Sequence, residues 1–316
     1  MSAREKIAGT SVVIPTYRRP DVLLKCVASL LAGEHQPEEI VIVGRKGDAA
    51  TETAIAGIDV APHPGVRIRA AWVIEPGHVP PVEAGVRAAS GNLVAVVDDD
   101  VTVTPEWLPS MVRHFSDPTV GVVGGRVQVP GSPAPKLKGK PGCVSWYGKM
   151  WGNGGSVSGT TVLEVDTVME CNWMWRRELL GSLEFDPVLN FDDASMYGLD
   201  LSLQAKKRRY KVIYDPGALV YHHVAPRVPE LDRQERGPRL FSYCRNYTYI
   251  LLRRLPLWRR AVFLAWWFLI GEGGGWGLAA FMFDKLSGGW RKERHAVAVW
   301  RGKIEGVRLA VSARSR

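Results

Sequence analysis

Short apolar runs alternate with helix-like segments along the first 125 residues of the chain. Segments 19–33, 79–90 and 104–115 lie between the runs, and the first of them repeats its apolar residues at the spacing of one helical face. The apolar runs are SVVIP (11–15), EIVIVG (39–44), AAWVIE (70–75), LVAVV (93–97) and VGVVGG (120–125). Because these runs are apolar throughout rather than at alternate positions, both faces of each strand should be buried. The pattern predicts an α/β fold with a mainly parallel sheet and helices on both faces.

Charge is distributed unevenly along the 316 residues. Residues 1–200 hold 18 Lys and Arg against 24 Asp and Glu, whereas residues 201–316 hold 23 against 8. The two parts therefore carry formal net charges of −6 and +15, which together give the +9 of the chain. A strongly basic C-terminal part suits a phosphate-rich partner such as an anionic lipid surface or a nucleic acid.

The segment 252–294 combines this basic charge with apolar and aromatic residues. Its continuous apolar stretch, 261–270, is ten residues long, while a membrane-spanning helix needs about 20. Arg, Lys and Trp residues flank the stretch, as they do in segments that lie among lipid headgroups. We expect 252–294 to contact a membrane surface; the alternative is a helical hairpin packed on the body or in a homodimer. The basic residues interleave with apolar runs, so nucleic-acid binding is not expected.

Cysteine usage and the N-terminus predict the compartment. The four Cys residues show no CxxC spacing, so we expect a reduced chain without a zinc site. The N-terminal sequence MSAREKIAGTSVVIP contains no apolar signal segment. Together with segment 252–294, these features predict a cytoplasmic protein that is peripheral at the inner face of the cell membrane.

Three adjacent carboxylates, Asp98 to Asp100, follow the apolar run 93–97 directly. In open parallel sheets ligands bind beyond the carboxyl ends of the strands. Consecutive side chains of an extended segment alternate in direction, so Asp98 and Asp100 share one side. Mg²⁺ and Mn²⁺ prefer oxygen ligands, usually one or two carboxylates together with substrate phosphates. The sequence predicts a divalent-cation site here; the alternative is an acid-rich turn or helix cap.

Four blocks of this sequence resemble family 2 glycosyltransferases of the GT-A fold. They are SVVIPTYRRPDVLLKCVASL, GNLVAVVDDDVTVTPEWL, MECNWMWRREL and GLDLSLQAKKRRYKVIYDPGALVYHH, which occur in the family's order and spacing over about residues 10–225. The resemblance implies a transferase that takes a sugar from a nucleotide-diphospho-sugar and inverts the anomeric carbon. It divides the chain into a GT-A domain (1–228) and a basic, Trp-rich helical region (229–316). Within the domain, about 1–126 would bind the nucleotide-sugar and 127–228 would serve the acceptor.

The resemblance also implies roles for individual residues. Asp98 and Asp100 match the family's D-x-D pair, with Asp100 holding the metal and Asp98 facing the ribose or the metal. Residues 15–17 match a loop that contacts the nucleotide base, and Arg18 could reach a phosphate, although a plain strand-ending turn is the alternative. The expected donor contacts are Pro15, Thr16, Tyr17, Arg18, Asp48, Asp98 and Asp99.

Two departures from the family pattern leave the nucleotide specificity open. An acidic pair followed by Gly-Ser is replaced by VGRKGDAAT, in which Asp48 is the only acid and a candidate substitute. An Arg-Asn pair is replaced by Glu83 and Ala84, with Arg87 one turn further on. These losses sustain an alternative function, a non-catalytic GT-A scaffold that binds a sugar nucleotide or a partner protein.

Inverting transfer requires a carboxylate that takes the proton of the acceptor hydroxyl. Asp200 lies at the start of the predicted helix DLSLQAKKRRY, where the helix dipole favours a negative charge. An alignment without gaps, however, puts the family's usual base position at Gly198 and Asp200 at a second acidic position. Asp193 and Asp192, in the loop NFDDAS, are the rival candidates, and Asp200 as a plain helix cap is the alternative.

The remaining candidates complete the predicted site. His222, or failing that His223, follows the run GALVYHH and could ligate the metal through a neutral imidazole. Asn172 and Trp173 are candidates for the acceptor or sugar pocket because aromatic faces stack on sugars, with core packing as the alternative. The sequence thus predicts an inverting transferase, assisted by Mg²⁺ or Mn²⁺. It would move a sugar from a UDP-, GDP- or dTDP-linked donor to a hydroxyl of a glycan or lipid-linked acceptor.

Overall fold

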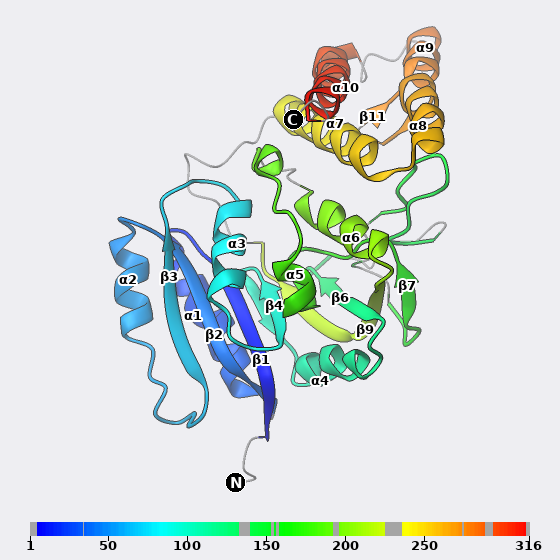
Figure 1. Ribbon diagram of the computed structural model, residues 1–316. Coiled ribbons are helices and arrows are strands. Elements are labelled where there is room, and N and C mark those ends of the chain that lie inside the picture. The colour runs from blue at the N-terminus through cyan, green and yellow to red at the C-terminus, as the bar shows by residue number, and fades with distance from the viewer. Residues whose placement is uncertain are drawn as a thin grey trace.

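Figure 1 shows a body that is built around a central sheet. A helical lobe, α7 to α10, lies against one end of this body. The structure is a computed structural model. It describes residues 5–33, 35–132, 140–152, 155, 158–191, 196–224, 236–273, 275–287 and 293–313.

Nine strands form the central sheet within these described residues. In spatial order they are β3 (Arg67–Val73), β2 (His35–Arg45), β1 (Glu5–Pro15), β4 (Leu93–Val97), β8 (Asn172–Arg176), β6 (Val120–Gln128), β9 (Lys211–His222) and β5 (Val101–Val103), with β7 (Leu163–Val165) also paired to β9. The first four strands are mutually parallel, whereas β8 runs antiparallel to both of its neighbours, β4 and β6. The expected α/β architecture is present, and each of the five predicted apolar runs lies on a strand.

Side-chain alternation explains why the central strands are apolar at every position. Val12 and Ile14 face one hydrophobic core, which α1 (Pro20–Ala32) and α4 (Trp107–Val112) cover. Val13, between them, faces a second core on the other side of the sheet. That side is covered by α3 (Val79–Ala88), α5 (Arg177–Gly181) and α6 (Tyr197–Lys207). Helix α2 (Ala49–Ala56) and the 3-10 turns η1 (Arg113–Ser116) and η2 (Pro187–Leu189) complete the body.

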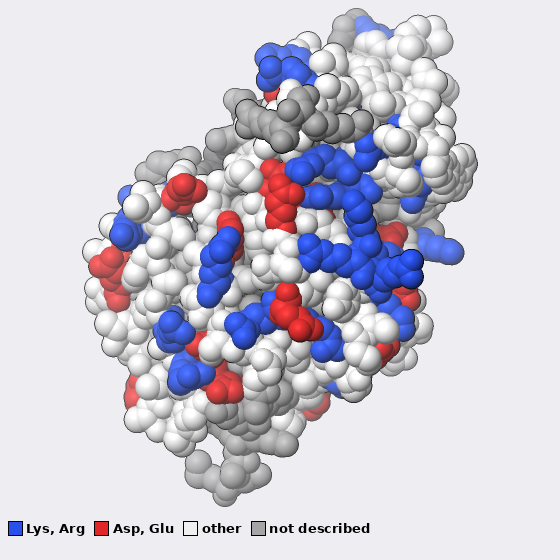
Figure 2. Space-filling view, in the orientation of Figure 1, with Lys and Arg blue, Asp and Glu red and all other residues white. Residues whose placement is uncertain are grey.

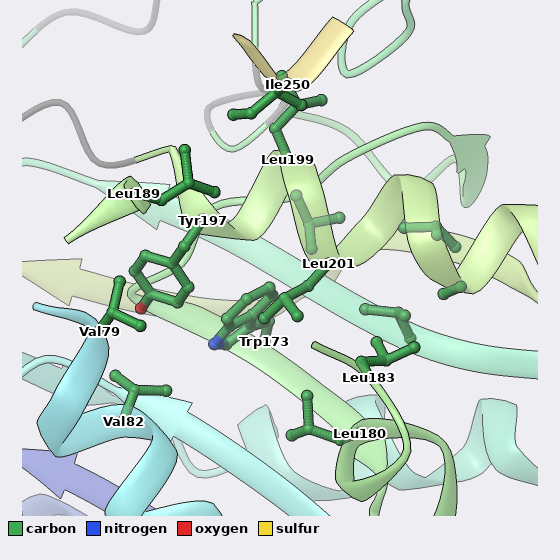
Figure 3. Close-up of a cluster of buried hydrophobic side chains, with 14 of the residues drawn as sticks. Val79, Val82, Trp173, Leu180, Leu183, Leu189, Tyr197, Leu199, Leu201 and Ile250 are labelled. Atoms are coloured by element: carbon green, nitrogen blue, oxygen red, sulfur yellow. The ribbon is translucent and has the colours of Figure 1, made fainter. Parts of the chain in front are cut away.

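The second core joins helices that are far apart in sequence, as Figure 3 shows. Val79 and Val82 of α3 lie beside Trp173 of β8 and Tyr197 of α6. Ile250, on α7 (Arg236–Arg254), closes the same cluster from the helical lobe. The lobe is therefore continuous with the core of the body.

The lobe itself consists of α7, α8 (Leu257–Leu269), the hairpin β10 (Gly271–Glu272) and β11 (Gly275–Trp276), α9 (Leu278–Leu286) and α10 (Glu293–Ser312). Gly302 and Gly306 let α10 approach α7 closely, because a Cβ on either would lie 2.5 Å from an α7 carbonyl oxygen. Lys303, between them, is fully buried and donates to the carbonyl oxygens of Trp267 and Trp276. None of the helices in the described ranges combines the length and apolarity that a membrane crossing needs.

Two consecutive arginines at the end of α7 tie the lobe to the body. Arg253 pairs with Asp186, and Arg254 pairs with Asp200 of α6. Tyr249, one turn before Arg253, donates its hydroxyl to the same Asp186 carboxylate at 2.6 Å. The end of α7 thus contacts the body through two ion pairs and one hydroxyl hydrogen bond.

Candidate active site

The carboxyl ends of β1 and β4 meet at one edge of the sheet because the two strands are parallel neighbours. Thr16, just after β1, donates its hydroxyl to Asp99 Oδ2 at 2.7 Å. Arg19 pairs with Asp99 at 2.5 Å and with Asp100 at 3.3 Å. Asp99 is fully buried, and its bonds to Thr16 and Arg19 hold the two loops together. The predicted first loop and the acidic trio thus lie side by side, more than 80 positions apart in sequence.

His222 joins the acidic trio through the pairing of β5 with β9, in which Val101 lies opposite His222. The His222 Nε2 atom lies 3.0 Å from Asp100 Oδ1. Asp98, Asp100 and His222 each offer one ligand atom, and these three atoms lie within 4.8 Å of one another. They are close enough to hold one ion. His223 instead bonds Thr102 Oγ1 at 2.8 Å, so the geometry selects His222 of the two candidates.

The electrostatics of this cluster favour a bound cation. Burial raises the pKa of Asp98, and the nearby Asp100 carboxylate raises it further. Burial also raises the pKa of Asp99 to about 7, against the opposing effects of Arg19 and Thr16. The hydrogen bond to Asp100 raises the pKa of His222. Carboxylate oxygens with one imidazole form a donor set that fits Mg²⁺ or Mn²⁺, and the positive charge would relieve the repulsion among the acids.

The loop after β1 is fixed by the end of β2. Arg18 adopts a left-handed backbone conformation (φ 53°), and its N–H donates to Asp48 Oδ2 at 2.6 Å. Asp48 also caps α2 by accepting from the backbone and the hydroxyl of Thr51. The Arg45 guanidinium lies 4.1 Å from the centre of the Tyr17 ring. Asp48 is thus buried, and both of its carboxylate oxygens accept hydrogen bonds from the Arg18 loop and from α2.

Asp200 does not present a free carboxylate, which corrects the first choice of base. Arg254 Nε and NH2 donate to its Oδ1 and Oδ2 at 2.6 and 2.7 Å, and Gln204 donates to Oδ2 at 2.8 Å. The side chain is 1% exposed, and Met196 rather than Asp200 occupies the N-cap of α6. Asp200 thus links α6 to α7. The rival candidates Asp192 and Asp193 lie outside the described residues.

The expected sugar-pocket role of Asn172 and Trp173 also needs correction, since both are buried in the core. Asn172 accepts from Trp107 Nε1 at 2.8 Å and donates to the carbonyl oxygens of Arg126 and Ala218 at 3.0 Å. The Trp173 ring packs edge-on against other aromatic rings, with no face toward solvent. These two residues fix β8 between β4 and β6.

Sequence reasoning missed two residues at this edge. One is Arg19, the counter-charge of Asp99 and Asp100. The other is Glu170, which accepts from the N–H of Gly198 at 2.6 Å. Both had a signal in the sequence: Arg19 is the second arginine of PTYRRP, and Glu170 is the only acid in the block MECNWMWRREL before the helix residue Glu178.

Comparisons with known proteins point to one family. The sequence profile of the glycosyl transferase family 2 matches residues 11–183, more than half of the chain. The succinoglycan biosynthesis protein ExoO of Rhizobium meliloti (strain 1021) is 32% identical over 114 residues, which cover 35% of this chain and 31% of ExoO. The O-antigen biosynthesis protein RfbC of Myxococcus xanthus is 29% identical over 133 residues, which cover 40% of this chain and 10% of RfbC. The chain thus spans less than a third of either relative.

Solved structures share the fold at low sequence identity. S. aureus TarS 1–349, in complex with UDP-GlcNAc, superposes with a TM-score of 0.55 at 15% identity over 81% of this chain and 71% of TarS 1–349. The mannosyltransferase PcManGT from Pyrobaculum calidifontis, in complex with GDP-Man and Mn²⁺, gives 0.54 at 14% identity over 96% of this chain and 87% of that one.

The sheet, with its acidic residues at the end of β4, has the GT-A fold that these solved structures share. The profile match then places it more narrowly: the chain belongs to glycosyl transferase family 2.

Proposed function

We propose that this glycosyltransferase moves a sugar from a nucleotide-diphospho-sugar to an acceptor hydroxyl with inversion, assisted by Mg²⁺ or Mn²⁺. The observation that carries the proposal is the cluster of Asp98, Asp100 and His222 beside the loop after β1. Structural neighbours in complex with UDP-GlcNAc, or with GDP-Man and Mn²⁺, support a nucleotide-sugar donor. Relatives named for succinoglycan and O-antigen biosynthesis support a cell-envelope glycan, or its lipid-linked precursor, as acceptor.

We assign the residues at this edge of the sheet to three roles: binding the cation, contacting the nucleotide and supporting the metal ligands. Asp98, Asp100 and His222 would hold the cation, which would supply positive charge to offset that of the departing diphosphate. Residues 15–18 and Asp48 form the nucleotide side of the site, with the loop fixed by the bond between Arg18 and Asp48. Thr16 and Arg19 hold Asp99, and through it the backbone on which both acidic ligands lie. In this division residues 1–126 bind the donor, residues 127–228 serve the acceptor, and residues 229–316 form the helical region.

One alternative is a GT-A scaffold that binds a sugar nucleotide without transferring it. The observation that favours it is Gly198, which supplies no side chain at the expected base position. The two functions differ in whether the protein cleaves its donor.

The experiment incubates the full chain and Mn²⁺ with UDP-glucose, UDP-GlcNAc, GDP-mannose and dTDP-glucose, and measures release of the nucleoside diphosphate. We expect one donor to be cleaved and Asp100→Asn to abolish cleavage. Asp59→Asn, an exposed carboxylate change outside the site, serves as the matched control. Donor binding without any cleavage would support the scaffold. Cleavage that survives in Asp100→Asn would refute the metal site.

We further propose that the helical lobe contacts an anionic membrane surface at the cytoplasmic face. No side chain of helix α9 is fully buried, and the helix exposes Met282, Phe283 (72%) and Leu286 (83%). Leu257 and Trp258, at the start of α8, are exposed as well. Figure 2 shows a largely uncharged surface over α8 and α9, with Lys and Arg side chains gathered over the adjoining part of the body. Apolar side chains next to basic ones match the two layers of a bilayer surface.

A further inference from the structure

The space beside Gly198 is filled by a carboxylate from another element. Glu170 Oε1 accepts from the Gly198 N–H at 2.6 Å. A Cβ placed on Gly198 would lie 2.4 Å from Glu170 Cγ and 2.8 Å from its Oε1. The Glu170 side chain therefore occupies the volume that a side chain at position 198 would take, and Gly198 makes that approach sterically feasible.

Strand pairing explains why Glu170 lies near the acidic trio. Strand β8 runs antiparallel to β4, and Asn172 lies opposite Val97. The residues just before Asn172 must therefore lie beside the residues just after Val97, which are the metal-site carboxylates. Burial raises the pKa of Glu170, and the charge of Asp98 raises it further.

The surroundings of Glu170 leave its carboxylate available. Within the described residues no Lys, Arg or His forms an ion pair with it, in contrast to Asp200. Burial raises the pKa of Glu170 to about 7, and the Gly198 N–H opposes that effect by stabilising the ionised form. The residue as a whole is partly buried rather than fully buried. A carboxylate of this kind can take a proton near neutral pH.

We propose that Glu170 is the general base of this transferase, delivered to the start of α6 from the loop before β8. This inference rests on the proposed function. The Gly198 N–H orients the carboxylate through Oε1, and Oε2 takes the proton of the acceptor hydroxyl. The acceptor oxygen forms its bond to the anomeric carbon as the bond from that carbon to the diphosphate oxygen breaks. The electron pair of the broken bond leaves on the diphosphate, and Glu170 later returns the proton to solvent.

The test uses water as the acceptor and the donor that the wild type cleaves in the presence of Mn²⁺. For Glu170→Gln we expect the rate of diphosphate release to fall by about 10²- to 10⁴-fold. The Mn²⁺-dependent thermal shift with donor should stay within about 1 °C of the wild-type shift, because the metal ligands are intact. Glu178→Gln, an exposed change on α5, is the matched control and should keep the wild-type rate.

A rescue variant separates a catalytic from a structural role. Glu170→Ala empties the space beside residue 198, and adding Gly198→Asp returns a carboxylate from the helix side. We expect the double variant to regain at least about tenfold in rate over Glu170→Ala, because the general base is restored. Gly198→Asp alone should lower the melting temperature, since its side chain meets Glu170.

Each outcome separates the inference from the proposed function. A wild type that cleaves no donor overturns both. An active wild type whose Glu170→Gln variant keeps its rate overturns the inference and leaves the metal-assisted transfer standing. A slow Glu170→Gln variant that has also lost the Mn²⁺-dependent shift, together with no rescue by Gly198→Asp, assigns Glu170 to the architecture of the site and likewise overturns the inference.

Discussion

Arg254 on α7 donates hydrogen bonds to both carboxylate oxygens of Asp200 on α6, from Nε at 2.6 Å and from NH2 at 2.7 Å. Asp200 is 1% exposed, and the Arg254 side chain is 13% exposed. Such a bidentate ion pair is strongly directional, because the planar guanidinium places two N–H groups parallel to the two carboxylate oxygens. It makes the body and the helical lobe depend on each other for stability.

Removing one partner of this pair should be more harmful than removing both. Arg254→Met leaves a buried carboxylate without its cation, at a cost of about 3–5 kcal/mol in the free energy of unfolding. Asp200→Leu combined with Arg254→Met should recover much of that loss. Arg87→Met, which removes an exposed pair with Glu83, is the control and should cost less than about 1 kcal/mol. Urea unfolding measures all three; equal losses in the two single arginine variants would contradict the prediction.

Asp200→Asn should leave catalysis largely intact in the molecules that fold. Its carboxylate is directed at Arg254 and Gln204, so it has no role in accepting a proton from the acceptor. We expect kcat for donor cleavage, corrected for the folded fraction, to stay within about tenfold of the wild type, well short of the loss for removing a general base. A loss as large as that of Glu170→Gln would restore Asp200 as the base.

Arg19 should matter most when no metal is bound. Its guanidinium is paired with Asp99 and Asp100, so Arg19→Gln in EDTA leaves these buried acids without that cation and lowers the melting temperature. A divalent ion restores positive charge, so Mn²⁺ should raise the melting temperature of Arg19→Gln more than that of the wild type. Asp100→Asn provides the reference with no metal response. Equal Mn²⁺-induced changes in melting temperature for the wild type and Arg19→Gln would show that the guanidinium and the ion do not both neutralise the acidic residues.

Lys303 should make stability depend on pH in the alkaline range. Burial lowers the pKa of Lys303 to about 8, whereas an unfolded lysine has a pKa of about 10.4. Between these values the unfolded chain binds more protons, so the free energy of unfolding should rise with pH. Relative to Lys303→Met, which cannot titrate, the wild type should gain up to about 1.4 kcal/mol per pH unit from pH 8 to 10. A pH-independent difference between the two proteins would contradict the assignment.

The apolar face of the lobe should bind vesicles that contain phosphatidylglycerol. Replacing Phe283 and Leu286 by serine removes two of the most exposed apolar side chains, and binding in a sedimentation assay should fall by at least about tenfold. Ile74→Ser, at an exposed apolar position on the body, is the control and should bind normally. A wild-type dimer that the double variant turns into a monomer, with no vesicle binding by either, would assign this face to a homodimer.

The sequence carried enough information for the sheet but not for the whole site. The runs 11–15, 39–44, 93–97 and 120–125 are apolar throughout and largely buried on both faces, whereas β5 and β7 have three residues each and no readable pattern. The run on β3 is the exception to the expected burial, because the side chains of this edge strand are exposed or only partly buried. Helix α2 was missed because its eight residues carry no apolar stripe. The acidic trio was found because it follows a strand directly in the chain. The role of Asp200 depends on Arg254, 54 positions away, and the position of Glu170 depends on strand pairing, so neither follows from local pattern.

The two adjacent arginines at the end of α7 form ion pairs with two acids of the body, Asp186 and Asp200. A helix end that is held at two neighbouring points can neither slide nor swivel without breaking an ion pair. The catalytic edge would then stand at one constant height above whatever surface the lobe rests on. With the lobe on a membrane as we propose, that fixed spacing would favour acceptors whose reactive hydroxyl extends a matching distance from the surface.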